Sequence, residues 1–256
     1  MKTNNTTNSK QHLSGIALTS AIVATAFALL TAMSPAQALG GNPNPGVIPP
    51  HATFNDKTYG EWGAAWWQWA LSIPADRSPF TDRTGQFCSE NQSGPVWFRG
   101  GAASSRETTC TIPAGKAIFM PVFNWIFGAG VYDCEPSVPG VTCDVPTLQA
   151  AAAVATETAT VLEVSLDGAP IRNIRDYRAS SPGPFPVLYP TNNVLGLPAG
   201  VYFPQVTDGY WLMLAPLRKG THILRVHVEA LGAGISFTSV THLIIVEQED
   251  AAGAQN

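Results

Sequence analysis

The segment Tyr59–Leu71 limits the possible folds of this chain more than any other, because it holds four of the seven tryptophans. Thr58 and Glu61 stand three positions apart at its start, which is the spacing of a capping box. Pro74 follows its end and disfavours helical backbone at the residue before it. Large apolar side chains recur at the period of an α-helix and form one stripe: Tyr59, Trp62, Trp66, Trp69 and Ile73. The sequence therefore predicts an amphipathic, tryptophan-rich helix.

Trp67 and Leu71 lie on the opposite side of that helix, with Gln68 beside them. A helix that is apolar around most of its circumference is usually buried on more than one side, which favours a core helix lying on a sheet. In the alternative interpretation, Trp67 and Leu71 line a groove that binds a sugar ring or another flat ligand. The exposure of Trp67 in the folded protein distinguishes the two.

Residues 1–38 have the three parts of a secretory signal peptide. Lys2 and Lys10 make the beginning basic, Ile16–Met33 is apolar, and Ala36–Ala38 has the small-x-small pattern of a cleavage site. An uncleaved membrane anchor is the alternative, because the apolar run is long for a signal peptide. We predict an exported protein, periplasmic or extracellular, with no membrane insertion after cleavage.

The charge of the remaining chain limits its partners. Without Lys2 and Lys10, 12 basic residues stand against 18 acidic ones, a net charge of −6. This balance argues against a nucleic-acid partner and against an anionic membrane surface. Ala117–Val131 is apolar but short and contains Pro121 and Asn124, so we interpret it as a buried strand. The oligomeric state stays open.

Four cysteines in an exported chain predict two disulfides. Closeness in sequence favours Cys88–Cys110 together with Cys134–Cys143, and two other pairings are possible. A metal site is the alternative for these cysteines, but the sequence has no C-x-x-C spacing to support it.

The chain beyond the tryptophan-rich helix is predicted to be mainly β, except for a short Ala-rich helix at about Pro146–Thr156 with Asp144 or Thr147 as its cap. Pro121 predicts an edge strand or a bulge, and Asp167–Gly168 predicts a hairpin turn. Runs rich in β-branched and aromatic residues predict these strands: Val96–Phe98, Cys110–Ile112, Lys116–Phe123, Thr158–Leu166, Pro170–Ile174, Tyr210–Leu214, His222–Ala230 and Ser236–Glu247.

These elements predict a single β-sandwich-like domain over residues 57–249, with consecutive strands antiparallel. Residues 39–56 are rich in Gly, Pro and Asn and predict a flexible lead-in, and residues 250–256 predict a frayed tail. Tyr177–Gly200 is also rich in Pro, Gly and Asn. It predicts a long loop of the kind that often carries function.

Asp76, Asp82 and Glu90 form the acidic cluster best placed for chemistry. A pair of them could serve as the two carboxyl groups of a glycoside hydrolase, or the three could bind calcium. Alternatively, they are solvated and pair locally with Arg77 and Arg83. The sequence contains no G-x-S-x-G elbow, phosphate-binding loop or H-E-x-x-H motif.

His222 and His227 are five residues apart on one predicted strand, so they face opposite sides of a regular sheet. At most one of them shares a face with His242, and a two-histidine site would still need a carboxylate from elsewhere. We therefore expect no metal site and no cofactor.

Several motifs together resemble a family of exported bacterial proteins that has no assigned activity. The motifs are Tyr59-Gly-x-Trp62, Trp66-Trp-Gln-Trp69 with Ile73-Pro74, Gly94-Pro-Val-Trp-Phe98, Cys110-Thr-Ile-Pro-Ala-Gly-Lys116, Asp208-Gly-Tyr-Trp211 and Gly220-Thr-His222. The resemblance covers most of the chain after residue 38. It implies export from a bacterium and transfers no catalytic residue.

The excess of tryptophan on an acidic β scaffold favours a non-catalytic binding or envelope protein that presents aromatic side chains to a glycan or a similar cell-envelope ligand. An exported hydrolase using Asp76, Asp82 or Glu90 is the competing hypothesis. In a third, the protein is purely structural and every tryptophan belongs to the core.

Overall fold

The computed structural model describes residues 42–44, 46–102, 104–131 and 144–247. The predicted signal peptide, the tail and the Cys134–Cys143 pair lie outside these residues. No helix within them is long and apolar enough to span a membrane.

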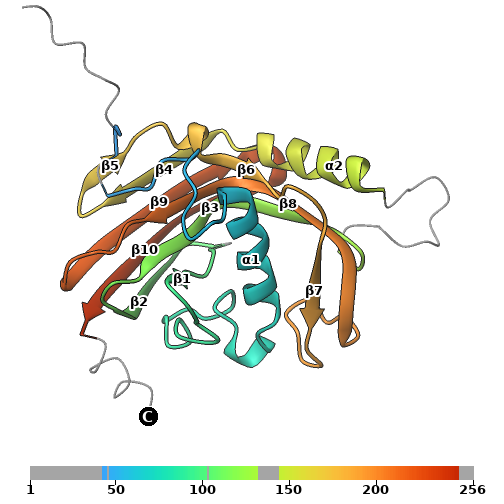
Figure 1. Cartoon of the computed structure of the whole chain (residues 1–256), viewed down its shortest axis with the longest axis horizontal. Coiled ribbons are helices and arrows are strands. Elements are labelled where there is room, and N and C mark those ends of the chain that lie inside the picture. The colour runs from blue at the N-terminus through green and yellow to red at the C-terminus, as the bar shows by residue number, and fades with distance from the viewer. Residues whose placement is uncertain (1–41, 45, 103, 132–143, 248–256) are drawn as a thin grey trace, which may run out of the picture. The chain divides into compact units, whose positions relative to one another are not determined.

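The described chain is mainly β, as predicted, and forms two sheets that contribute to one hydrophobic core (Figure 1). The first sheet has the order β1-β3-β8-β6, and β7 also pairs with β8. Its strands are β1 (Val96–Phe98), β3 (Ala117–Gly128), β6 (Arg178–Ser180), β7 (Phe185–Tyr189) and β8 (Gly200–Leu214). The second sheet has the order β2-β10-β9-β4-β5. Its strands are β2 (Arg106–Pro113), β4 (Val161–Leu166), β5 (Ala169–Ile171), β9 (Gly220–Ala230) and β10 (Ile235–Val246).

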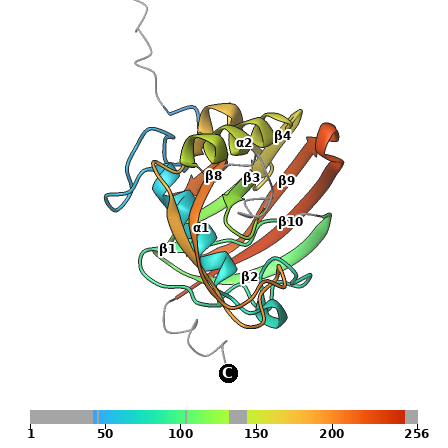
Figure 2. The ribbon, with the colours of Figure 1, turned by 90° about the vertical axis from the view of Figure 1, so that its right-hand side faces the viewer.

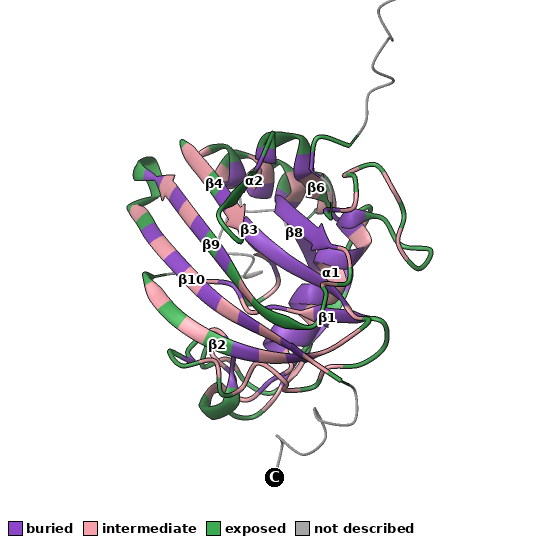
Figure 3. Ribbon diagram, turned by 90° about the vertical axis from the view of Figure 1, so that its left-hand side faces the viewer, coloured by how far each residue is buried: buried purple, intermediate pink, exposed green. Residues whose placement is uncertain are grey.

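The strands of the second sheet bury one face only. Along β9, Leu224, Val226 and Val228 are buried while the residues between them are not, and β10 shows the same alternation (Figure 3). The last ten residues of β8, from Gln205, are all buried. Alternation gives way to a continuous buried run there because β8 is covered on both faces.

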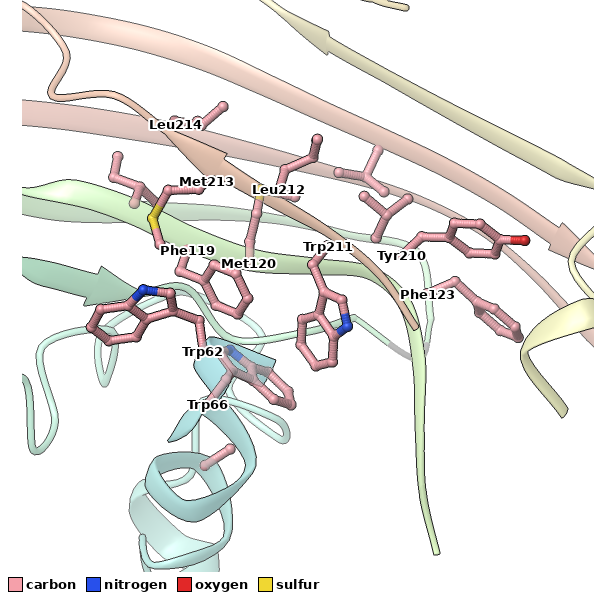
Figure 4. Packing of buried hydrophobic residues seen from close by; sticks show 14 of the residues in the cluster. Trp62, Trp66, Phe119, Met120, Phe123, Tyr210, Trp211, Leu212, Met213 and Leu214 are labelled. Atoms are coloured by element: carbon pink, nitrogen blue, oxygen red, sulfur yellow. The ribbon is translucent and has the colours of Figure 1, made fainter. Parts of the chain in front are cut away.

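Helix α1 (Tyr59–Leu71) covers one face of the first sheet, and its tryptophans pack against β3 and β8 (Figure 4). The predicted capping box is present. Trp66 meets Trp211 edge to face at 5.8 Å between ring centroids, and Trp211 stacks on Phe119 at 5.3 Å. These contacts confirm the prediction of a core helix lying on a sheet.

Glycines let α1 approach the sheet closely. A Cβ atom at Gly60 would lie 2.0 Å from the carbonyl oxygen of Ser180 in β6, and one at Gly63 would lie 3.0 Å from the ring of Trp211. Any larger residue would push the helix outward and separate the tryptophan rings from their partners.

Helix α2 (Val145–Glu157) is the predicted Ala-rich helix, and Asp144 caps it by accepting from the backbone N–H of Thr147. Leu148 and Ala152 are buried against Val206 of β8, so α2 lies along the first sheet (Figure 2). Asp167 and Gly168 both have positive φ and join β4 to β5, as the hairpin prediction required.

The strand order differs from consecutive antiparallel pairing. β1 pairs with β3 and β2 pairs with β10, both in parallel, and β1 and β2 belong to different sheets although they are neighbours in sequence. β8 and β9, neighbours in sequence, belong to different sheets.

Two predicted irregular segments are ordered parts of the domain. Tyr177–Gly200 is not one long loop, because it contains β6 and β7, which both pair with β8. Within the predicted flexible lead-in, Asn44 is buried and bonds to Arg172 and Tyr177, and Val47 bridges to Leu214. Residues 42–56, apart from residue 45, are therefore attached to the domain rather than free, because they form backbone and side-chain hydrogen bonds with it.

Candidate functional site

A cavity of about 250 Å³ lies beside α1, between the second half of β3 and the beginning of β10. Its walls are mainly apolar and aromatic. The lining includes Trp67, Leu71, Phe80, Ala102, Asn124, Trp125 and Phe237. Ligand pockets are usually about 300–1,000 Å³ and apolar with a few polar groups, so this cavity suits a small ligand.

Trp67 and Leu71, the predicted ligand-binding pair, both line this cavity, although neither forms an exposed surface. Trp67 is 9% exposed and Leu71 is 2% exposed. Trp67 donates through Nε1 to the hydroxyl of Thr207 at 2.9 Å, and that hydroxyl donates to the carbonyl of Trp125 at 2.6 Å. Phe80 stacks on Trp67 at 5.8 Å. The indole ring is therefore a fixed wall of the cavity.

The indole N–H groups of the other three helix tryptophans also donate to the protein itself. Trp62 bonds to the carbonyl of Phe54, Trp66 to that of Arg99 and Trp69 to that of Glu90. The rings of these three residues are buried. Trp67 is therefore the tryptophan through which α1 contributes to the cavity.

A bulge in β3 sets the remaining wall. The pairing with β8 shifts register between Pro121 and Phe123, which confirms the irregularity predicted for Pro121. Beyond the bulge, Asn124 pairs with Gly209, where a Cβ atom would lie 2.5 Å from the Cβ of Asn124. The absence of a side chain at Gly209 thus lets Asn124 occupy its place on the cavity wall.

The amide nitrogen of Asn124 is buried and has no hydrogen-bond partner among the described residues. An unpaired buried amide costs roughly 1–3 kcal/mol, so native proteins rarely keep one without a use. Asn124 is also the one polar side chain among the described residues that line the cavity.

Each of the predicted carboxylates has its own protein partners. Asp82 is buried and accepts four hydrogen bonds, from the N–H groups of Thr84, Gly85 and Phe87 and from the Thr84 hydroxyl. Burial alone would raise the pKa of Asp82, but these bonds outweigh it and lower the pKa below its ordinary value.

The other two carboxylates serve the same connection. Asp76 accepts from the side-chain amide of Asn192 at 2.9 Å, and Glu90 forms an ion pair with Arg77. Among the described residues, no group of three or more His, Cys, Asp or Glu side chains could hold a metal ion. These carboxylates stabilise the chain between α1 and β1.

The histidines are also separate from the cavity. His222 bonds to Asp167 at 2.7 Å and to the carbonyl of Arg218. Burial lowers the pKa of His222, but these two partners outweigh it and raise the pKa above its ordinary value. His227 bonds to Thr238 and His242 to Glu107.

The Cys88–Cys110 disulfide is present, as predicted, with a Cα–Cα distance of 5.7 Å. It attaches the connection after α1 to β2. Cys134 and Cys143 lie outside the described residues.

Sequence reasoning missed Asn124, Phe80 and Phe237 as lining residues. The available signal was a single amide in the apolar run Ala117–Val131, three positions after a proline that predicted a bulge. The contribution of β10 had no sequence signal, because it depends on how the two sheets face each other.

Comparisons with known proteins add no functional assignment. No family model and no curated protein matches the chain. A structure of PbICP-C in complex with falcipain-2 matches with 9% identity and a TM-score of 0.23, covering 60% of this chain and 100% of that one. A likeness of that size carries no argument about this protein.

Proposed function

We propose that this protein is an exported, non-catalytic binding protein that holds a small, mainly apolar ligand in the cavity beside α1. The observation that carries the proposal is a cavity walled by aromatic side chains in which Asn124 is the one polar side chain of the described lining. The disulfide supports export, because disulfides persist in oxidising compartments.

The lining favours a flat ring or a short hydrocarbon chain with one acceptor oxygen. A sugar ring carries several hydroxyl groups, and each one buried without a partner costs about 1–3 kcal/mol. A glycan is therefore the less favoured ligand for this cavity, although one face of a sugar could stack on the ring of Trp67.

Neither of the other two hypotheses gains a specific observation. A hydrolase would need carboxylates that face a substrate, whereas Asp76, Asp82 and Glu90 face protein groups. A purely structural role accounts for Trp62, Trp66 and Trp69 but leaves the amide of Asn124 unexplained.

Calorimetric titration with two probes tests the proposal. The probes are 2-naphthol, a flat ring with one hydroxyl oxygen, and methyl β-glucoside. Ala102 lines the cavity, so Ala102→Phe fills it, while Val154→Phe adds the same ring at a position that is 67% exposed on α2.

We expect the wild type and Val154→Phe to bind 2-naphthol, and Ala102→Phe to bind it at least about tenfold more weakly, a difference of 1.4 kcal/mol. Binding of the glucoside alone would support the glycan alternative. The proposal fails if the wild type binds neither probe, or if Ala102→Phe binds 2-naphthol as well as the wild type does.

A further inference from the structure

Arg99 is a buried cation that lacks a carboxylate partner. It follows β1, is 5% exposed, and forms no ion pair with any carboxylate of the described residues. Its side chain reaches the second sheet, where Nε and Nη2 donate to the hydroxyl of Thr241 and Nη2 donates to that of Ser239. Burying a charge with only neutral partners is unfavourable.

The guanidinium nevertheless keeps its charge. Burial, together with the nearby charge of Arg106, lowers the pKa of Arg99 to about 9. That value is still above neutral pH, so Arg99 carries its positive charge at neutral pH.

A second arginine beside it has an unused donor. Arg106 donates through its terminal nitrogens to the carbonyls of Phe80, Asp82 and Gly101, but its Nε is buried and finds no acceptor among the described residues. The carboxylate oxygens of Asp82 are already bonded to backbone N–H groups. Two guanidinium groups and one carboxylate leave this cluster with a net positive charge.

Both arginines line one small cavity of about 30 Å³, together with Asp82, Thr108, Thr241 and the disulfide residue Cys110. A water molecule needs roughly 10–15 Å³ of such space. The cavity therefore has room for one monoatomic anion or about two water molecules, and it is small for a sulfate or a phosphate.

We propose that this cavity binds a halide ion, held between Arg99 and Arg106. The anion balances the charge of Arg99 at the place where the chain crosses from the first sheet to the second, and the nearby charge of Arg106 strengthens its attraction. The site is separate from the cavity beside α1 and does not depend on the function proposed for it.

The first test is thermal unfolding of the purified protein at constant ionic strength, with sodium chloride replaced stepwise by sodium gluconate. A ligand that binds only the folded state raises Tm with the logarithm of its concentration. We expect Tm to rise with chloride and with bromide. Equal Tm in chloride and gluconate would overturn the proposal.

Two further measurements locate the effect. Crystals soaked in bromide should show an anomalous peak between Arg99 and Arg106, whereas density without anomalous signal would mean water and would also overturn the proposal. Arg99→Met should abolish the halide dependence of Tm. The control Arg175→Met removes an arginine that bonds to the carbonyls of Ala159 and Thr160, and it should retain that dependence. If Arg99→Met does not fold, the bromide experiment on the wild type decides.

Discussion

The Thr207 hydroxyl links the two main walls of the cavity, so replacing it tests how the site is held. It is 1% exposed, accepts from the indole of Trp67 and donates to the carbonyl of Trp125. Thr207→Val keeps the shape of the side chain and creates no cavity. It removes both hydrogen bonds of the hydroxyl: the bond to the carbonyl of Trp125 is lost, and the buried N–H of Trp67 is left without an acceptor.

The expected loss of stability follows from these two changes. An unsatisfied buried N–H costs about 1–3 kcal/mol, and the lost bond to the carbonyl adds about 0.5–1.5 kcal/mol. We expect the free energy of unfolding to fall by about 2–4 kcal/mol, a large part of the roughly 5–15 kcal/mol of a typical domain. For a domain of this size, Tm should fall by roughly 4–16 °C.

Urea unfolding of the wild type and the variant measures this difference in the free energy of unfolding. If the dependence of that free energy on urea concentration has the same slope in both proteins, the unfolded state is unaffected. Thr81→Val is the matched control, because Thr81 is exposed and bonds to the carbonyls of Ala75 and Ser78 at the surface. It should cost less than about 1 kcal/mol. If Thr207→Val costs no more than Thr81→Val, the hydroxyl does not hold the walls together.

Three other changes address the helix, the cavity and the acid response. Gly60→Ala places a Cβ atom 2.0 Å from the carbonyl oxygen of Ser180, so the free energy of unfolding in urea should fall by about 1–3 kcal/mol. The control Gly183→Ala, where a Cβ atom would have nothing within 4 Å, should not lower it. Equal losses in the two variants would show that the close approach of α1 is unimportant. Asn124→Leu removes the unpartnered amide, so the free energy of unfolding should rise by about 1 kcal/mol. Calorimetry should show that the variant binds 2-naphthol more weakly than the wild type does. A loss of stability would mean that the amide has a hydrogen-bond partner. The lowered pKa of Asp82 means that its contribution to stability is present above its unfolded pKa, about 3.9, and is lost as pH falls through the folded value. Asp82→Asn should therefore be less stable at pH 7 and lose less stability between pH 5 and pH 2 in a thermal series, and an unchanged acid response would contradict this.

Local features could be predicted wherever the determining interactions lie within a few residues. The α1 capping box needs only Thr58 and Glu61, and the β4–β5 hairpin needs only Asp167–Gly168. The bulge in β3 follows from Pro121, which has no N–H to donate. The Cys88–Cys110 disulfide was predicted from the closeness of the two cysteines in the sequence, and it is present.

Strand pairing within Tyr177–Gly200 could not be predicted in the same way. Its prolines and glycines are typical of a loop, yet β6 and β7 form because β8 offers them backbone partners. Those partners lie in a strand that starts only at Gly200. The residues that stabilise β6 and β7 are therefore mostly outside the segment, where a local pattern cannot detect them.

The sequence by itself determined a mainly β chain with an amphipathic tryptophan helix, because side-chain period and capping are local properties. Only the tertiary structure decided what the tryptophans do. It buries all four tryptophans of the helix and makes Trp67 one wall of a cavity. It also brings Arg99 to the hydroxyl of Thr241, 142 residues away. Such sites arise where separate elements pack together, and no local pattern encodes which distant residues will meet.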